Sequence, residues 1–529
     1  MSKGKGKTVF AREATGLVRE IGWFTAIAMV MSAVIGAGIN GFAVQSYGYS
    51  GSVNTVDPLI MVLFAAIPFL CSAVCLGIMS SAMPRSGGPY VIISRTVSPA
   101  AGFLTTWGSW VSIALSTGLL AWWDISFWGS SFTIAGAVTG VAGLTAAGTL
   151  LGDVLVQMIL AIVLVILISL IAVLGFNIWG RVVQLLFIIP VIGSLITIFG
   201  LLVHTAGDFQ GFWNAVFGST ATYGTIMTSG ATYTPSFIGS LAALPGVIFA
   251  FTAFYAASYV GGEVKNPKRN MITSNVIGML LIIVFFVAYV GGLALSVGPN
   301  FLYAYGNGGY GKSVAPATLP LFAAVYFFQI PIVAIFVAIT GALWLLNDLP
   351  PFLAIATRST FAWAFDREFP EKFADVSERF HSPVWSIVLC CALAIPGVIL
   401  TGIGPLFSLF FITIIDTFTY LFICIAALFF IKKFKSAYEK GAKLGGPATL
   451  YFFGIVGIIF WLFAIGFVFY VVFNQELVSM AGYLYNPFLE VALTLITFVV
   501  GAAIYLYYKS RNKKRGIDVS KIYGAIPPE

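Results

Sequence analysis

The chain has 529 residues, of which 59% are hydrophobic and only 9% are charged, and its mean hydropathy is +0.99. Soluble domains carry roughly 25% charged residues, so this composition excludes a soluble fold. The net charge of +8 would suit a protein that binds nucleic acid, but it would also suit a membrane protein with basic loops. The positions of the basic residues decide between these two classes.

Twelve apolar stretches are long enough to cross a bilayer as helices, which takes about 20 residues. They lie near residues 22–45, 58–83, 98–128, 154–174, 180–203, 240–261, 272–297, 322–353, 384–402, 406–431, 449–473 and 486–508. With twelve crossings both termini lie on one side, and on this topology every Lys and Arg except Lys312 lies on that side too. Because Lys and Arg mark the cytoplasmic side, we expect an all-helical, multi-pass protein of the plasma membrane with both termini in the cytoplasm. Nucleic acid is not needed to explain the charge.

The spans divide the chain into parts of different character. Residues 1–20 and 509–529 are predicted cytoplasmic tails, 205–239 an extracellular loop, and 449–508 two peripheral helices. The two large parts, 21–204 and 240–431, hold five predicted helices each.

Two of the spans contain residues that weaken a helix. The first span holds Gly36-Ala37-Gly38, and the sixth holds the segment 249–255 after Pro245-Gly246. Glycine costs a helix roughly 1 kcal/mol relative to alanine, and unpaired backbone at membrane depth is tolerated only where it is buried or lines a cavity. Five spans separate the two sites, so a repeat of spans 1–5 as spans 6–10 must be inverted in the membrane. This pattern predicts broken helices 1 and 6 around a binding site, as in secondary transporters. The alternative is that the glycines let two helices pack closely.

Four motifs then resemble those of amino acid–polyamine–organocation (APC) permeases, in the same order. They are Glu20–Trp23 with Ser32–Ile39 in span 1, Pro84–Tyr90 after span 2, Glu263–Asn270 after span 6, and Thr357–Pro370 with Ser382-Pro383 after span 8. The resemblance extends over about residues 19–431, and the last two spans match in hydropathy only. It implies ten core helices in two inverted five-helix repeats with two peripheral helices. It also implies a secondary transporter that takes up amino acids by alternating access.

The resemblance also implies a substrate site made largely of backbone. The substrate carboxylate would meet the amides of Gly36, Ala37 and Gly38, where a helix start favours an anion, and its ammonium group would meet carbonyls of helices 1 and 6. The implied substrate-binding residues are Val34, Gly36, Ala37, Gly38, Ile39, Phe249, Thr252, Ala253, Tyr255 and Phe352. The chain departs from the family at Ala253, where a glycine is common, and at Tyr255, where some members have an acidic residue. It also has Pro190 near the position of a helix 5 lysine of some members.

Two carboxyl groups are predicted at membrane depth, where an ionisable residue suggests function by default. Asp416 lies near the middle of span 10, and Asp348 follows Asn347 on span 8 just before Pro350-Pro351, which predicts a helix distortion. We expect Asp348 or Asp416 to accept the coupling proton. Sodium held by Asp348, Asn347 and helix 1 carbonyls is the alternative, and so are purely structural roles. A third acidic residue, Asp124, is expected in a solvated outer vestibule.

Other functions remain as alternatives at this point. A polyamine or cationic amino acid carrier or exchanger would use Asp348 and Asp416 to recognise a basic group. A metal triad, a nucleophile elbow or a phosphate loop is not found in the sequence, so neither an enzyme nor a metal or other cofactor is predicted. The expected partners are an amino acid, a proton or sodium ion, and the lipid bilayer.

Overall fold

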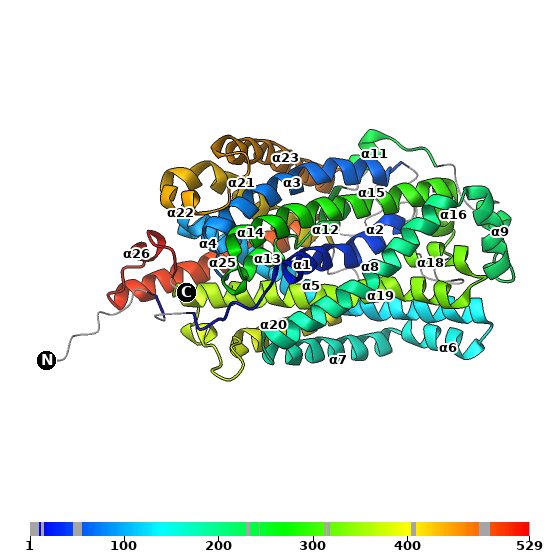
Figure 1. Ribbon diagram of the computed structural model, residues 1–529, viewed down its shortest axis with the longest axis horizontal. Helices are drawn as coiled ribbons and strands as arrows, with labels where there is room; N and C mark the ends of the chain where they lie inside the picture. Colours follow the sequence, from blue (N-terminus) through cyan, green and yellow to red (C-terminus); the bar gives the residue numbers. More distant parts are fainter. Residues whose placement is uncertain are drawn as a thin grey trace.

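The computed structural model describes residues 10–11, 15–45, 55–228, 233–242, 244–310, 314, 318–403, 409–474 and 487–527. Within these ranges the secondary structure is helical, apart from the isolated bridges Ile21↔Val264 and Ser86↔Val260. The long helices run roughly along one axis, and the first and last described segments lie at the same end of the bundle (Figure 1). We call this end the terminal face. It is formed by residues 15–22, 84–98, 260–267, 365–383, 434–446 and 509–527.

Nine helical segments of the described chain are long and apolar enough to cross a membrane. They are Pro58–Ala82 (α3), Val154–Val173 (α7), Ile178–Val203 within α8 (Phe176–Val203), Pro267–Ser296 (α14, η3 and α15), Pro331–Phe365 (α19), Val384–Ile403 (α20), Thr413–Lys433 within α21 (Leu409–Lys433), Pro447–Val471 within α23 (Pro447–Phe473), and Leu489–Lys514 within α25 (Pro487–Lys514). Eight of the twelve predicted spans correspond closely to single segments of this set. The predicted span 322–353 is shifted: its first residues belong to α18 (Leu319–Ala324) and η4 (Val325–Phe327), and the long helix α19 starts at Pro331 and continues to Phe365.

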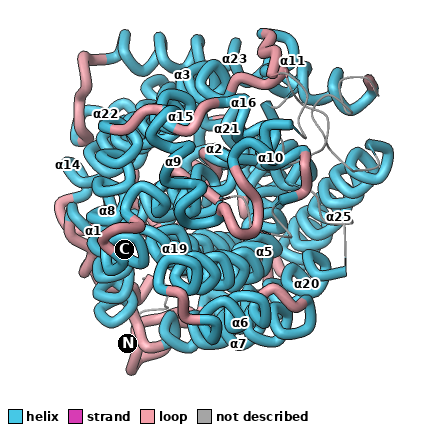
Figure 2. Tube along the Cα trace, turned by 90° about the vertical axis from the view of Figure 1, so that its right-hand side faces the viewer, coloured by secondary structure: helices cyan, strands magenta, loops and turns pink. Residues whose placement is uncertain are grey.

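The longest helix is α5 (Pro99–Thr139), which lies with α19 near the middle of the bundle (Figure 2). Small residues bring α5 against α20: a Cβ on Gly118 would lie 2.0 Å from the Ala394 carbonyl oxygen, and one on Gly397 would lie 2.1 Å from that of Leu115. The last two long helices are peripheral. Only 17% of the α25 span and 28% of the α23 span are buried, against 67% for α3. Their remaining apolar surface suits contact with lipid.

Helix 1 differs from the prediction. Its residues form α1 (Trp23–Val34), a π-helical turn η1 (Ile35–Ile39) and α2 (Asn40–Gln45) without interruption. The expected break at Gly36–Gly38 is therefore wrong for this conformation. The side-chain amide of Asn40 donates to the carbonyls of Ile35 (2.9 Å) and Gly36 (3.0 Å). These bonds satisfy carbonyls of the wide turn, so the chain bulges and stays helical.

Helix 6 is broken as predicted. α11 (Phe237–Ala242) and α12 (Leu244–Ala250) precede a run of turns at 251–255, which is followed by α13 (Ala256–Tyr259) and η2 (Gly261–Glu263). Ala253 has φ +67°, in the left-handed region that costs an L-residue roughly 1–2 kcal/mol. It is the position at which the resemblance implied that a glycine is common.

The remaining short elements connect these helices. At the terminal face they are α4 (Pro89–Thr96), η5 (Glu371–Ala374), α22 (Lys435–Lys440) and α26 (Ser520–Tyr523), and at the opposite end they include α6 (Ala142–Leu151), α9 (Ala206–Phe217), α10 (Tyr223–Thr228) and α16 (Pro299–Asn307). Lys312, the predicted exception among the basic residues, lies outside the described residues.

Candidate functional site

The two glycines of η1 are points of close approach. A Cβ on Gly36 would lie 2.0 Å from Asp348 Oδ2, so the carboxyl group of Asp348 packs directly on the helix 1 backbone. A Cβ on Gly38 would lie 2.4 Å from the carbonyl oxygen of Ala250, the last residue of α12. Helix 1 therefore touches α19 through one glycine and the broken helix 6 through the other.

The surroundings of Asp348 are rich in oxygen atoms. Asp348 and Asn347 are buried on α19, and the Asn347 amide donates to Ser32 Oγ of helix 1 (2.6 Å). Among the described residues the Asn347 side-chain oxygen has no hydrogen-bond donor. Pro350 and Pro351 lie inside α19, which continues as a helix through both of them. Proline has no N–H, however, so neither proline can donate to the carbonyl four residues earlier.

Asp416 of α21 lies on the other side of the site, at the helix 6 break. The Tyr255 hydroxyl donates to Asp416 Oδ1 (3.1 Å), and the Tyr420 hydroxyl lies 3.3 Å from Oδ2. Tyr420 is also 3.4 Å from the Thr252 hydroxyl. Asp416, Tyr255 and Tyr420 are all fully buried. This carboxyl group is thus bonded to the segment between α12 and α13, and hydroxyl groups reach both of its oxygens.

The other predicted residues lie around these contacts. Phe249, near the end of α12, faces Trp123 of α5 with ring centroids 6.0 Å apart. Phe352 follows Asp348 by one helical turn on α19, and so lies on the same face. Of the predicted substrate-binding residues, those whose exposure is described are buried; they are Val34, Gly36, Gly38, Ile39, Phe249, Thr252, Ala253, Tyr255 and Phe352. Ala37 belongs to η1, and its side chain lies outside the described part.

The structure corrects the prediction for Asp124. We expected a solvated residue, but only 1% of Asp124 is exposed. The reason is the length of α5, which continues to Thr139, well beyond the predicted end of its span at 128. Asp124 therefore lies inside the helix bundle and away from its rim.

Four residues of the site were not predicted. Tyr420 follows Asp416 by four residues, a spacing that places both on one helix face and that the sequence displays. Asn40 lies two residues after Gly38. Ser32 and Ser109, which bonds Thr419 beside the Asp416 site (2.7 Å), carry no local signal, because only tertiary packing brings them to the site. Within the described chain there is no group of three or more His, Cys, Asp or Glu side chains that could hold a metal ion.

Comparisons with known proteins agree with this architecture. The amino acid permease family matches residues 21–501 of the chain. The serine/threonine exchanger SteT of Bacillus subtilis is 24% identical over 464 residues, which cover 86% of this chain and 92% of SteT. The b(0,+)-type amino acid transporter 1 of mouse is 24% identical over 279 residues, so the chain spans about half (51%) of that relative's length. An uncharacterized transporter of Mycobacterium tuberculosis is 24% identical over 377 residues, or 69% of this chain and 70% of the relative.

These relatives are transporters and not enzymes. The family match extends over nearly the whole chain, and it includes both helix 1 and the broken helix 6. The chain therefore belongs to the amino acid permease family of the APC superfamily of membrane transporters.

Proposed function

We propose that this permease takes up amino acids across the plasma membrane by alternating access, with protons as the coupling ion. One observation carries the proposal: a broken helix 6 lies against a glycine-bearing helix 1, and a buried carboxyl group borders each of them. Discontinuous helices form the substrate sites of many secondary transporters; here helix 6 is broken, and helix 1 is widened at η1 where the two helices meet.

We propose twelve transmembrane helices in two inverted five-helix repeats followed by two peripheral helices. The nine long segments supply nine crossings, and α5 with helices 1 and 6 would supply the rest. The direction of the chain supports inversion: the Glu20 N–H donates to the Glu263 carbonyl (2.9 Å), so helix 1 begins where helix 6 ends. The positive-inside rule assigns the terminal face to the cytoplasm.

In this proposal the substrate is held as a zwitterion between helices 1 and 6. Its carboxylate binds the amides of Gly36–Gly38, and its ammonium group binds carbonyls of Val34, Phe249 and Thr252. The amides of η1 take part in the π-helical turn in the conformation described, so the substrate would replace those bonds and open the turn. Phe249, Phe352 and Tyr255 would then contact the substrate side chain, together with Ile39 and Ala253, which favours neutral or moderately apolar amino acids.

Asp348 is the proposed proton acceptor because of its contact with Gly36. Ionised Asp348 would repel a substrate carboxylate arriving at the same turn, and two like charges a few ångströms apart repel strongly when water is excluded. A proton on Asp348 removes that repulsion, so proton and substrate bind together. Asp416, which is already bonded to Tyr255 and Tyr420, would act as a fixed part of the helix 6 wall.

Sodium is the second candidate for coupling. A cation beside Gly36 would neutralise Asp348 as a proton does. Three oxygen atoms could bind it. One is the side-chain oxygen of Asn347, which has no hydrogen-bond donor among the described residues. The others are the carbonyl oxygens of Leu346 and Asn347, to which Pro350 and Pro351 cannot donate a hydrogen bond. Oxygen ligands of this kind suit a hard cation.

Uptake of radiolabelled solutes by the purified protein in liposomes tests these proposals together. One panel would hold neutral and cationic amino acids, polyamines and nucleobases, each measured with an inward proton gradient, an inward sodium gradient, or neither. We expect neutral amino acids to accumulate only with the proton gradient. Accumulation only with sodium would favour the sodium site. A preference for polyamines or cationic amino acids would indicate that Asp348 and Asp416 recognise the substrate's basic group. Counterflow without gradient-driven accumulation would indicate an exchanger.

A further inference from the structure

The segment that follows α25 folds back onto the terminal face. The Asn512 amide donates to the Arg367 carbonyl (2.8 Å), and Arg515 pairs with Glu371 (3.3 Å). Beyond this anchor Ile522 is fully buried. Pro527 is also buried, against a small pocket that Arg85, Phe361 and Asp366 help to line. Residues 517–527 are therefore packed on the permease core.

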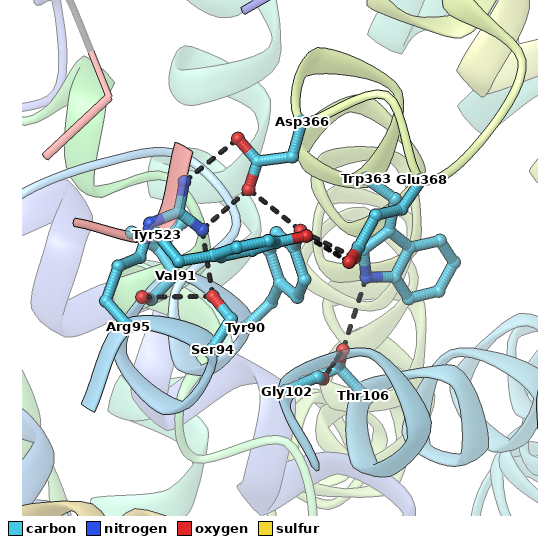
Figure 3. Close-up of polar contacts among 10 residues, drawn as sticks. All are labelled: Tyr90, Val91, Ser94, Arg95, Gly102, Thr106, Trp363, Asp366, Glu368 and Tyr523. Atoms are coloured by element: carbon cyan, nitrogen blue, oxygen red, sulfur yellow. Dashed lines mark hydrogen bonds and ion pairs between the residues drawn. The ribbon is translucent and has the colours of Figure 1, made fainter. Parts of the chain in front are cut away.

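The centre of this contact is a polar cluster in which Tyr90, Arg95, Asp366 and Glu368 are buried and Tyr523 is half-buried (Figure 3). Arg95 donates to both oxygens of Asp366 (2.6 and 2.9 Å). The Tyr523 hydroxyl of α26 donates to Glu368 Oε1, and the Arg95 guanidinium lies 5.4 Å from the centre of the Tyr523 ring. Tyr523 is thus the residue by which the segment joins the cluster.

The geometry of Tyr90 indicates that Glu368 carries a proton. The Tyr90 hydroxyl oxygen lies 2.8 Å from Asp366 Oδ2 and 2.8 Å from Glu368 Oε2, but a hydroxyl has one hydrogen to donate. One of the two contacts therefore needs a proton on the carboxyl group. Asp366 is bonded twice by Arg95, which favours its ionised form. The proton belongs on Glu368, which would otherwise add a second negative charge to a cluster with one cation.

The segment also bridges two parts of the terminal face. The Pro527 carbonyl accepts a hydrogen bond from Arg85 Nε (2.6 Å). Arg85 belongs to the loop before α4, and this loop is bonded to α13, because the Gly87 N–H donates to the Tyr259 carbonyl (2.9 Å). Tyr523 instead holds Glu368, just after α19. An ion pair between Glu263 and Arg358 (2.9 Å) joins the same two parts. Opening this face by rocking one group of helices against another requires these bridges to part.

We propose that residues 517–527 are an autoinhibitory latch, which closes the terminal face while Glu368 is protonated and releases it when Glu368 ionises. The latch goes beyond the proposed function, and rests on it only for the assignment of this face to one end of the transport path.

The protonation equilibrium of Glu368 gives the direction of the response. Burial, with the nearby charge of Asp366, raises the pKa of Glu368 from its ordinary 4.5 to about 8, although Tyr523, Tyr90 and Arg95 oppose the shift. Release would expose Glu368 to water and return its pKa toward the ordinary value. Docking is therefore strongest below about pH 4.5, weakens as the pH rises, and stops changing above about pH 8. Over this window it weakens by up to roughly three thousand-fold.

The groups that face Glu368 from the surrounding elements do not reverse this direction. Tyr90 and Arg95 come from α4, Asp366 from the end of α19, Tyr523 from α26 and Tyr505 from α25. Burial holds the pKa of Tyr90 and of Tyr523 well above 10, so both hydroxyls keep their hydrogen. Since this face is assigned to the cytoplasm, acidification there would close the latch and limit further proton-driven uptake.

Spin-label distances would test the latch without any transport. In a cysteine-free background, labels at Ala525→Cys and Glu439→Cys, both on exposed positions, report the segment relative to α22. We expect one narrow distance at pH 5 and a broad distribution at pH 9. Glu368→Gln, which stays neutral, should remain narrow at pH 9, and Tyr523→Phe should broaden at lower pH than the parent. Glu378→Gln removes an exposed carboxylate nearby and should respond as the parent does.

Two results would overturn the proposal: a distribution that does not change between pH 5 and 9, or an unchanged pH response in Glu368→Gln. A transport measurement provides a test that does not depend on the spin-label distances. Truncation after Gly516 should raise initial uptake several-fold at an internal pH of 6 and little at pH 9, and equal rates at pH 6 would contradict autoinhibition. Loss of all uptake in both forms would contradict the proposed function instead, and the distances would still decide whether the segment opens.

Discussion

Helices 1 and 6 both depart from α-geometry at the candidate site, but they do so differently. Helix 1 holds Gly36 and Gly38 at the expected break and stays helical, because it widens into the π-turn η1 with Asn40 bonded to its carbonyls. Helix 6 has no glycine between Phe249 and Tyr255, yet the chain breaks there and holds Ala253 at a positive φ. The residues best suited to a break thus lie in the helix that does not break.

This difference shows what the glycines do. Gly36 and Gly38 bring helix 1 into contact with Asp348 and with the backbone of Ala250, where any side chain would collide. The break in helix 6 is fixed instead by neighbours: Phe251 stacks on Phe69 (5.0 Å), and Phe254 packs on Tyr420 (5.5 Å). Close packing, the alternative to a broken helix 1, describes its glycines better in this conformation.

The largest expected effect separates the two glycine contacts. Gly38→Ala meets backbone that cannot move aside, so we expect uptake to be lost and the protein to be destabilised by about 3 kcal/mol, at the upper end for overpacking. Gly36→Ala meets the carboxyl group of Asp348, which can rotate, and should cost only about 1–2 kcal/mol. Apparent melting temperatures of the purified variants measure this difference.

A double variant provides the control for this pair. Asp348→Ala should recover most of the stability lost in Gly36→Ala and none of that lost in Gly38→Ala, because only the first contact is with Asp348. Equal recovery in both backgrounds would mean that the two glycines do not have separate partners.

An intermediate effect is expected at the helix 6 break. Tyr255→Phe removes the hydroxyl that donates to Asp416 Oδ1, and a buried acceptor left without its donor costs about 1–3 kcal/mol. We expect weaker substrate binding by about ten-fold, since this hydroxyl links the broken segment to α21. Tyr289→Phe, which removes a buried tyrosine hydroxyl away from Asp416, is the matched control. If both variants bind substrate equally, the Tyr255–Asp416 bond does not shape the site.

The smallest effect should come from Ala253. Ala253→Gly removes a Cβ from a left-handed position, so we expect it to stabilise the protein by up to about 1 kcal/mol and to leave uptake intact. Ala253→Val should do the opposite. A lower melting temperature for Ala253→Gly would indicate that the Ala253 methyl packs favourably enough to outweigh its backbone strain.

Most of the fold could be predicted from hydropathy and length. The boundaries of α3, α7 and α20 lie within a residue or two of the predicted spans, because a run of apolar residues bounded by loops defines a transmembrane helix. The predicted C-terminal ends of α5 and α19 were wrong. Both helices continue for more than ten residues beyond the predicted spans, into segments that contain polar residues and are nevertheless helical. Asp124 was misplaced for the same reason.

The candidate site could be predicted only in part. Spacing and resemblance identified Tyr255, Asp348 and Asp416, and the structure brings Tyr255 and Asp416 together. The resemblance placed Asp348 beside helix 1, and the structure shows its carboxyl group on Gly36, a contact between residues 312 positions apart that spacing alone could not reveal. The π-turn was missed because glycine content alone does not distinguish a widened helix from a broken one.

The account depends most on Asp348 as the coupling group, and one measurement tests it directly. Liposomes containing the wild type, Asp348→Asn or Asp416→Asn would be given an inward proton gradient, and accumulation and exchange of the preferred amino acid would be compared. We predict that Asp348→Asn exchanges substrate but does not concentrate it, because its side chain is always neutral, whereas Asp416→Asn still concentrates substrate with weaker affinity. Proton-driven accumulation that survives in Asp348→Asn, or that is lost only in Asp416→Asn, would contradict the account.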